Sequence, residues 1–498
     1  MRRRTPVDNR DYRRLSVACC AALLALAGAI WPGMAAAQSE RGSDQQLKQR
    51  IETPTLDNGL KVIAIPDHSL PIATIEIALR HGAFAESPEF DGLSHLYEHM
   101  FFKGNGEIPD QEAYLKRIKE LGIVFNGTTS SERVNYFFTL PRENLKKGMI
   151  FMRHALLTPK FNDEEFQKEK QVVLSEYDRS ESQPQQSFHR QMQRLLWYKH
   201  PSRKITLGSR EVIENATVEQ MKTIKDRYYV PNNAALIVAG DVDPKSAFEM
   251  AKSIFGEWKR GDEPHKAQPV PEHPPLDEKQ FLVQEDDVEV PSVEIRWQGP
   301  SVDEDPEATY AADVLSFILS QPSSKFQKAL VESNIALNAG LSYYTLSHTG
   351  PISASMQVPP DNLRKSIKVL LKELHKLQNP DYFTDQQLEN AKTILETQDI
   401  YSREKTSSFA HTVSFWWAVD DVGYYLNYVD NLNAVTREDI SNYVSEYILG
   451  KPYVLGVLLN SKMNKKLGLT KKELAKIVKE VQSELKSGDK QGQKTSAS

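Results

Sequence analysis

Several segments of this chain occur twice at a nearly constant spacing, and this repetition limits the folds that the chain can adopt. Two segments return 218 positions later (75 to 293 and 86 to 304), and a third returns 219 positions later (217 to 436). The matched pairs are Ile75–Ile77 with Val293–Ile295, Glu86–Glu89 with Glu304–Glu307, and Thr217–Gln220 with Thr436–Asp439. Matches that keep one offset over such distances indicate a duplicated unit. We therefore expect two homologous domains in tandem.

Each half places strand-like stretches before long helical ones, a pattern typical of an α+β fold with an antiparallel or mixed sheet. The clearest expected elements are strands at 74–79, 135–140, 234–239 and 453–459 and helices at 161–180 and 217–229. The predicted fold class is therefore α+β, with two homologous α/β sandwich-like domains.

The domain boundaries follow from length and proline content. A chain of 498 residues exceeds one ordinary core, and five prolines between Arg260 and Lys279 indicate a stiff, exposed linker. We predict an N-terminal domain at 46–260, a linker at 261–280, a C-terminal domain at 281–486 and a disordered polar tail at 487–498. Apolar residues at helical spacing from Leu474 to Leu485 are expected to dock the last helix on its own domain.

The N-terminus has the pattern of a signal peptide. An arginine-rich start precedes an uncharged apolar run, Val17–Ile30, and then Ala35–Ala37. The run is shorter than the roughly 20 residues of a membrane span, so we predict a signal peptide at 1–37 with cleavage near Gln38 and a periplasmic or secreted product. Both cysteines, Cys19 and Cys20, lie in this segment. The mature protein therefore has no cysteine nucleophile, thiolate metal site or disulfide.

The segment 91–102 contains the residues best suited to catalysis. If it is helical, His95 and His99 lie one turn apart on one face and can bind the same zinc ion. Glu98 is adjacent and can act as the general base of a metallopeptidase. A surface helix with two solvated histidines is the alternative. The apolar residues around the motif disfavour it, because they indicate a buried helix on which histidines need partners.

A catalytic zinc also needs a third protein ligand and an open position. Glu169 and Glu176 are seven residues apart on a predicted helix, so both point the same way. The spacing does not decide which carboxylate binds the metal and which supports a ligand. The net charge of −5, with no basic block, makes nucleic acid a poor candidate for a partner.

The chain resembles the pitrilysin/insulinase family of inverzincin peptidases, whose short bacterial members are similar to mitochondrial processing peptidase subunits. The resemblance rests on His-x-x-Glu-His followed by Phe101–Gly104, and on Phe125–Thr129, Glu169–Glu176, His200–Ser209 and Tyr228–Asn233. It covers nearly all of the mature first half, and the duplication extends it into the second.

The resemblance implies one zinc ion per chain, with Glu176 as the third ligand and Glu169 as a supporting catalytic glutamate. Asn126, Gly127 and Thr128 would belong to an edge strand that pairs with extended substrate. The family fold implies that this chain forms half of a clamshell chamber. The implied activity is an endopeptidase that cuts peptides or unfolded segments by zinc-activated water, with Glu98 as the base.

The second half lacks the metal motif. At the 218-residue offset, the positions of His95, Glu98 and His99 are taken by Asp313, Ser316 and Phe317. Active relatives supply an Arg and a Tyr from this half. Here Val331 stands at the Arg position, and Tyr343 matches the Tyr only if a short insertion is allowed. The resemblance therefore implies a heterodimer with a homologous sister chain that carries the Arg/Tyr pair. A homodimer with a reduced rate is the alternative.

Two other functional classes are compatible with the sequence. One is a non-catalytic scaffold subunit, and the other is a periplasmic protein that holds peptides without cutting them. Neither class needs stoichiometric zinc. The complete His95, His99 and Glu98 motif favours the peptidase.

Overall fold

The computed structural model describes residues 51–495, with side chains to Ser487. The predicted signal peptide at 1–37, its cleavage site near Gln38 and both cysteines lie outside these residues and remain predictions. Within the described part of the chain, no helix is long and apolar enough to cross a membrane.

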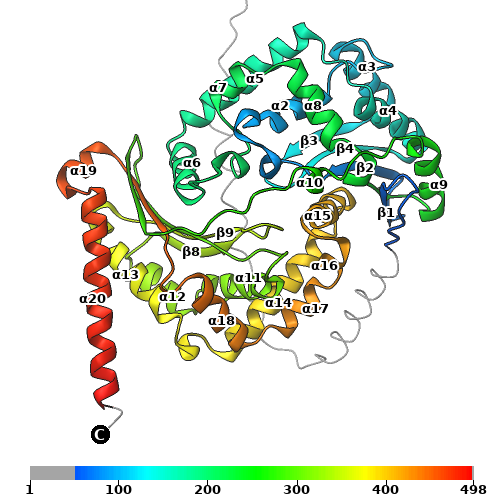
Figure 1. The fold of residues 1–498 in the computed structure, drawn as a ribbon. Coiled ribbons are helices and arrows are strands. Elements are labelled where there is room, and N and C mark those ends of the chain that lie inside the picture. The colour runs from blue at the N-terminus through cyan, green and yellow to red at the C-terminus, as the bar shows by residue number, and fades with distance from the viewer. Residues whose placement is uncertain (1–50, 496–498) are drawn as a thin grey trace, which may run out of the picture. The chain divides into compact units, whose positions relative to one another are not determined.

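The first half builds one sheet and its helices. Its elements are β1 (Lys61–Pro66), β2 (Ile72–Leu79), α2 (Leu93–Phe101), α3 (Gln111–Leu121), β3 (Val124–Thr129), β4 (Val134–Pro141), α4 (Leu145–Leu157), α5 (Asp163–Glu181), α6 (Pro184–Leu196), α7 (Arg210–Glu214), α8 (Val218–Tyr228), β5 (Ala234–Gly240) and α9 (Pro244–Phe255). Figure 1 shows these elements in blue to green.

The second half repeats this plan. Its elements are β6 (Gln280–Glu285), β7 (Ser292–Gln298), α11 (Pro306–Ser320), α12 (Lys325–Gln327), β8 (Asn338–Tyr343), β9 (Pro351–Gln357), α13 (Leu363–Lys376), α14 (Asp385–Ser402), α15 (Thr406–Val419), α16 (Val422–Leu426), α17 (Tyr428–Ala434), α18 (Arg437–Tyr447), β10 (Val454–Leu459), α19 (Ser461–Leu467) and α20 (Lys471–Thr495).

The two sheets have the same topology, which confirms the duplicated α+β fold. Their strand orders are β1-β5-β2-β4-β3 and β6-β10-β7-β9-β8, and in each the first pair is parallel and the others are antiparallel. The registers correspond as well. Ile75 lies opposite Val238, and its counterpart Val293 lies opposite Val457.

The repeated threonine segments begin equivalent helices. Thr217 caps α8 by accepting a hydrogen bond from the backbone N–H of Gln220, whose side chain accepts from the backbone N–H of Thr217 in return. Thr436 and Asp439 form the same capping box at α18. Each box satisfies two backbone N–H groups that a helix start leaves unpaired. The sequence repeat thus preserves a local folding signal as well as a pattern of apolar residues.

One helix from each half packs on the sheet of the other half. Helix α6 lies against β6, β7 and β10, whereas α15 lies against β2 and β5 (Figure 1). Gly456 of β10 permits the first contact, because a Cβ there would lie 2.3 Å from the Met192 sulfur of α6. In the second contact, the buried Glu76 of β2 hydrogen-bonds to His411 and Ser414 of α15. This exchange holds the two halves together.

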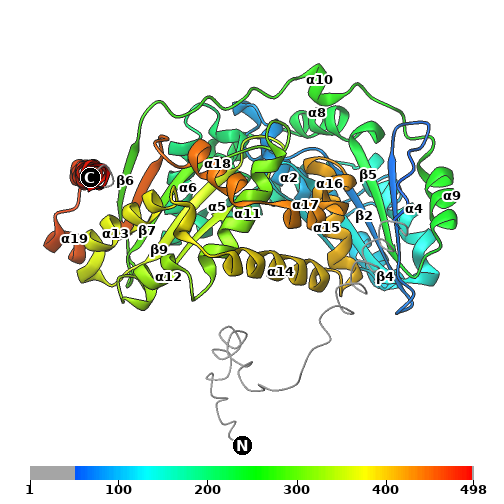
Figure 2. The same cartoon turned by 90° about the horizontal axis from the view of Figure 1, so that it is seen from below.

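The linker contains more structure than predicted. A single helical turn, α10 (Pro264–Ala267), lies on the connection between the sheets (Figure 2), and Pro264 and Leu276 are buried. A proline fits the first turn of a helix, where its missing N–H is not needed. The rest of the connection has few buried side chains, as expected for a linker.

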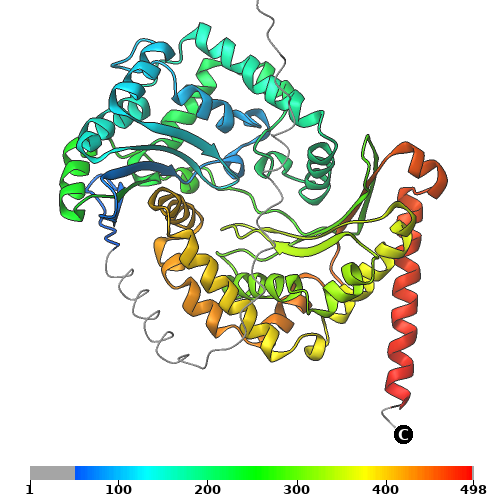
Figure 3. The ribbon, with the colours of Figure 1, turned by 180° about the vertical axis from the view of Figure 1, so that it is seen from behind.

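The C-terminal helix docks as predicted but extends further than expected. Leu474, Ile477, Val478 and Val481 of α20 are buried, and the helix packs along α13 (Figure 3). The prediction of a disordered tail from 487 differs from the structure, in which α20 continues to Thr495.

Candidate metal centre

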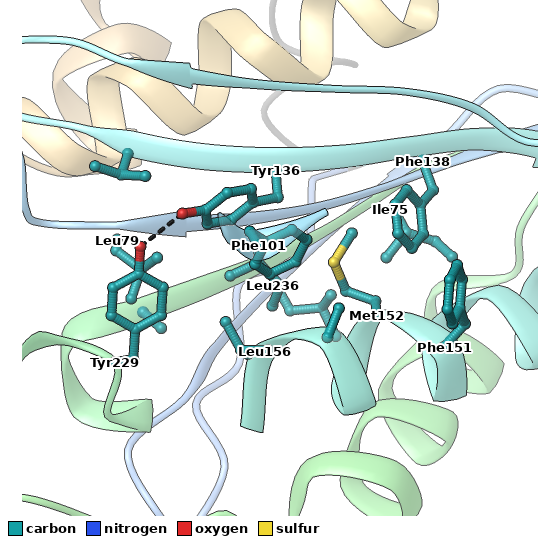
Figure 4. Packing of buried hydrophobic residues seen from close by; sticks show 14 of the residues in the cluster. Ile75, Leu79, Phe101, Tyr136, Phe138, Phe151, Met152, Leu156, Tyr229 and Leu236 are labelled. Atoms are coloured by element: carbon teal, nitrogen blue, oxygen red, sulfur yellow. Dashed lines mark hydrogen bonds between the residues drawn. The ribbon is translucent and has the colours of Figure 1, made fainter. Parts of the chain in front are cut away.

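Helix α2 carries the His-x-x-Glu-His motif and is fixed to the first sheet by its apolar face. Phe101 stacks on Tyr136 of β4 with ring centroids 3.6 Å apart, and the hydroxyls of Tyr136 and Tyr229 share a 2.6 Å hydrogen bond (Figure 4). Both rings are almost fully buried. The histidines one turn away are therefore held on a helix that cannot easily rotate.

The start of α2 is held by a carboxylate that the sequence analysis missed. The backbone N–H groups of Gly92 and Ser94 donate to the buried side chain of Glu86 at 2.8 and 2.7 Å. Gly92 has a φ of 93°, a conformation that favours glycine. Burial raises the pKa of Glu86 to about 8, and the hydrogen bonds from Gly92 and Ser94 oppose this shift.

His95, His99 and Glu176 come together as predicted. Their potential ligand atoms all lie within 4.8 Å of one another, and no other such group of three occurs within the described residues. The two histidine Nε2 atoms lie 3.7 and 3.8 Å from Oε2 of Glu176. Ligands of a tetrahedral zinc, bound at about 2.0–2.2 Å, lie about 3.4 Å apart. The two histidine–glutamate distances are therefore within a few tenths of an ångström of the spacing that zinc needs.

The protonation of His95 suits metal binding. Burial, and then the neighbouring His99, lower the pKa of His95 to about 4. The imidazole is therefore neutral at pH 7, which is the form that binds a metal.

Glu169 contacts His99 and is not one of the three side chains whose ligand atoms converge. Its Oε2 lies 3.1 Å from Nδ1 of His99, and its Oε1 accepts a 2.6 Å hydrogen bond from Lys103. Burial alone would raise the pKa of Glu169, but the hydrogen bonds from His99 and Lys103 outweigh it and lower that pKa. A carboxylate at Nδ1 favours a proton there and leaves Nε2 of His99 free for a metal.

Lys103 belongs to the motif Phe101–Gly104, but no role was predicted for its side chain. It is almost fully buried, and its Nζ pairs with Glu169. Its position four residues after His99, close to the same helix face, is the sequence signal that could have indicated this contact.

Glu98 points toward strand β3. Its Oε2 accepts a 2.7 Å hydrogen bond from the hydroxyl of Thr129. Burial raises the pKa of Glu98, and the hydrogen bond from Thr129 opposes the shift. A glutamate with a raised pKa is better matched to proton exchange near neutral pH than an exposed one. Thr129 was predicted only as part of the substrate strand and its motif Phe125–Thr129, and its contact with Glu98 was not predicted.

The predicted substrate strand borders a cavity of about 460 Å³. All of the described residues that line it belong to the first half: His95, Glu98, Gly127, Thr128, Thr129, Glu176, Arg179, Ser180, Gln183, Gln186, Thr206 and Leu207. Asn126, predicted with Gly127 and Thr128 to contact substrate, lies on β3 but does not line the cavity. Strand β3 is an edge strand that pairs only with β4 among the described strands.

The lack of a side chain at Gly127 leaves space for the side chain of Glu98. A Cβ at this position would lie 2.9 Å from Cγ and 3.1 Å from Oε1 of Glu98. We expect Gly127→Ala to displace the carboxylate and to lower peptide hydrolysis about tenfold to a hundredfold without loss of metal, because misplacing a catalytic group by about 1 Å can cost a hundredfold. Initial rates and zinc content measure the two effects.

The matched control is Gly340→Ala. Gly340 lies on β8, the corresponding edge strand of the second half, and a Cβ there would meet no atom within 4 Å. Equal rates for the two variants would contradict the role given to Gly127.

The second half has no equivalent metal centre among its described residues. Asp313, at the position of His95, is half-buried in α11 and accepts a hydrogen bond from Tyr428, and desolvation raises its pKa to about 6. Tyr343 donates to the carbonyl of Pro300 at 2.9 Å and does not line the cavity. Val331 lies in a short π-helical turn.

Comparisons with known proteins agree with the fold and with the family resemblance. A model of the insulinase family (peptidase family M16) matches residues 61–210, and a model of the peptidase M16 inactive domain matches residues 215–395. Together these two models cover more than half of the chain.

Individual relatives are distant. The chain is 25% identical over 412 residues to "Zinc protease PqqE" of Helicobacter pylori, covering 81% of this chain and 91% of the relative. It is 27% identical to the mitochondrial-processing peptidase subunit beta of Neurospora crassa, over 41% of this chain and 43% of that one. A crystal structure of a Helicobacter pylori protease has the same fold, with a TM-score of 0.73 and 24% identity over 82% of this chain and 99% of that chain.

Proposed function

Because the chain belongs to the insulinase family of peptidases, we propose that it is a zinc-dependent endopeptidase that hydrolyses peptides or unfolded segments. One observation carries the proposal: His95, His99 and Glu176 converge within 4.8 Å, with Glu98 on the same helix as both histidines. Relatives named zinc proteases support it.

The proposed roles follow from the contacts of each side chain. His95, His99 and Glu176 would hold one zinc ion, which when bound polarises the scissile carbonyl and lowers the pKa of a water molecule. Glu98 takes the proton from the attacking water and returns it to the leaving amine. Thr129 holds the Glu98 carboxylate through its hydroxyl, and Glu169 orients His99.

The substrate is proposed to be an extended backbone. Strand β3 offers a free edge beside the cavity, and an extended peptide can add to such an edge through main-chain hydrogen bonds. This mode favours short peptides and unfolded segments, because most of their backbone N–H and C=O groups are not already paired in a helix or sheet. The proposal is tested by comparing the zinc content and the peptide hydrolysis of the wild-type protein with those of Glu98→Gln.

We further propose that full activity needs a sister chain. The cavity is lined by the first half alone, and Val331 cannot donate a hydrogen bond to a developing oxyanion. A relative named as a subunit, the mitochondrial-processing peptidase subunit beta, supports a division of labour between chains. The partner would be a homologue that lacks His-x-x-Glu-His and carries the Arg/Tyr pair.

Mixing the two purified chains tests this proposal. We expect the sister chain to raise peptide hydrolysis about a hundredfold to a thousandfold, which is the usual effect of one oxyanion donor. Addition of a second aliquot of this chain, at the same total protein concentration, is the control. Full activity from this chain alone, unchanged by the sister, would exclude the heterodimer and leave the homodimer.

A further inference from the structure

Arg179 stands in the wall of the metal cavity without an ionic partner. It lies one helical turn after Glu176 on α5, and it is the only lysine or arginine among the described residues that line the cavity. Its guanidinium forms no hydrogen bond or ion pair with any described residue, and it is exposed. A guanidinium has five N–H donors in a planar fork suited to a carboxylate.

The acidic residues near Arg179 in the sequence contact other side chains. Asp178 pairs with Arg210, and Glu181 pairs with Arg190. Glu176 directs its Oε2 toward the Nε2 atoms of the two histidines. The positive charge of Arg179 is therefore not neutralised from within the described chain, although three carboxylates lie within three residues of it.

The neighbouring wall is polar and uncharged. Gln183 and Gln186, where α5 passes into α6, line the same cavity, and their side-chain amides form no hydrogen bond within the described residues. Each amide can donate N–H to an oxygen atom. Arg179, Gln183 and Gln186 thus form a surface with one net positive charge and several unused donors.

We propose that Arg179 selects peptides that carry an acidic side chain within about two residues of the bond that is cut. The inference rests on the proposed peptidase function. Residues one turn apart on a helix have Cβ atoms about 5–6 Å apart, and an extended peptide advances about 3.3 Å per residue. A carboxylate one or two positions from the scissile bond therefore comes within reach of the guanidinium. Charge-assisted, bidentate pairing then fixes the register of the peptide along β3.

The cutting test uses a fluorogenic peptide library randomised at three positions on each side of the bond, with cut sites identified by mass spectrometry. We expect wild-type protein to favour Asp or Glu at one of these positions about tenfold over Asn or Gln, as for one charge-assisted pair that remains partly exposed. Arg179→Gln should remove this preference, and Arg179→Glu should replace it with a preference for Lys or Arg. Arg179→Lys should retain part of it.

A structural role for Arg179 at the end of α5 would give a different result. It would lower the cutting of all peptides alike, whatever their charge. Arg117→Gln is the matched control, because Arg117 is a surface arginine of α3 that pairs with Glu120. An acidic preference that persists in Arg179→Glu, or no acidic preference in wild-type protein, would overturn the proposal.

A binding measurement separates this proposal from the proposed function. The Glu98→Gln protein, which should not cut, is titrated with a fluorescent peptide carrying Glu and with its Gln analogue. We expect about tenfold tighter binding of the Glu peptide, and we expect this difference to disappear when Arg179→Gln is introduced as a second substitution in the Glu98→Gln protein. This result supports the proposal even if this chain alone hydrolyses nothing. Equal binding of the two peptides overturns it while leaving the peptidase function intact.

Discussion

Glu98→Gln should lower peptide hydrolysis about a thousandfold while the protein keeps its zinc. The amide has nearly the shape of the carboxylate but cannot accept the proton from water, and general base catalysis contributes roughly a hundredfold to ten-thousandfold. Glu98 is not among the three converging ligand residues, and its Oε2 accepts a 2.7 Å hydrogen bond from Thr129, so the variant should leave the metal in place. Initial rates on a quenched-fluorescence peptide and zinc content measure the two properties.

The control for this variant is Glu249→Gln. Glu249 is an exposed residue of α9 with no hydrogen bond or ion pair to the described residues, so its loss should change neither rate nor zinc. If Glu98→Gln and Glu249→Gln cut peptides equally fast, the base has been assigned to the wrong residue.

Removing any one of the three ligands should abolish stoichiometric zinc and hydrolysis together. The binding free energy of a protein zinc site is about 10–16 kcal/mol, so a third of it is about 3–5 kcal/mol, or roughly two to four orders of magnitude in affinity. The variants are His95→Ala, His99→Ala and Glu176→Ala. Competition with a chromophoric chelator measures the affinity.

Glu169→Gln provides a graded comparison. Glu169 bonds Nδ1 of His99 and not the metal position, so we expect zinc to be weakened only about tenfold to a hundredfold, as for other groups that orient a ligand. The informative result is therefore the order in which the variants lose zinc affinity, with Glu169→Gln losing less than Glu176→Ala. A Glu169 variant that loses more zinc than Glu176→Ala would show that the two carboxylates have been assigned in reverse.

The duplicated fold could be predicted because its signals are local. Apolar strands appear where the sequence places them, with Ala234–Ala239 inside β5 and Tyr453–Leu459 covering β10. The predicted helix at 161–180 is α5, which begins at Asp163 after Asn162 accepts hydrogen bonds from its first turn. Caps, turns and apolar periodicity act within a few residues, so one sequence suffices to read them.

The exchange of α6 and α15 between the two sheets could not be predicted. Helix α6 is amphipathic and α15 is largely apolar, and such patterns show that a helix is buried without showing which sheet buries it. Gly456 of β10 makes the close contact with Met192 possible, but an isolated glycine in a strand can serve several other structural purposes. The contact between Met192 and Gly456 joins residues 264 positions apart (456 − 192).

The convergence of His95, His99 and Glu176 could be predicted, but most of the contacts that support these side chains could not. The spacing of His95 and His99 fixes one helix face, which is a local property. The choice between Glu169 and Glu176 depends on how α5 packs on α2, so the seven-residue spacing left it open. Lys103 and Thr129 contact Glu169 and Glu98 across 66 and 31 residues. Such partners are defined by tertiary packing alone.

The central claim is that one zinc ion, held by His95, His99 and Glu176, serves peptide hydrolysis assisted by Glu98. A scaffold subunit or a peptide-holding protein would need neither the metal nor the base. The most direct measurement is zinc per chain and peptide hydrolysis on the same preparations of wild-type and Glu98→Gln protein, each with the sister chain present. We expect one zinc per chain in both and hydrolysis only in the wild type. Wild-type protein that is free of zinc, or that cuts peptides equally well with Gln at position 98, would contradict the claim.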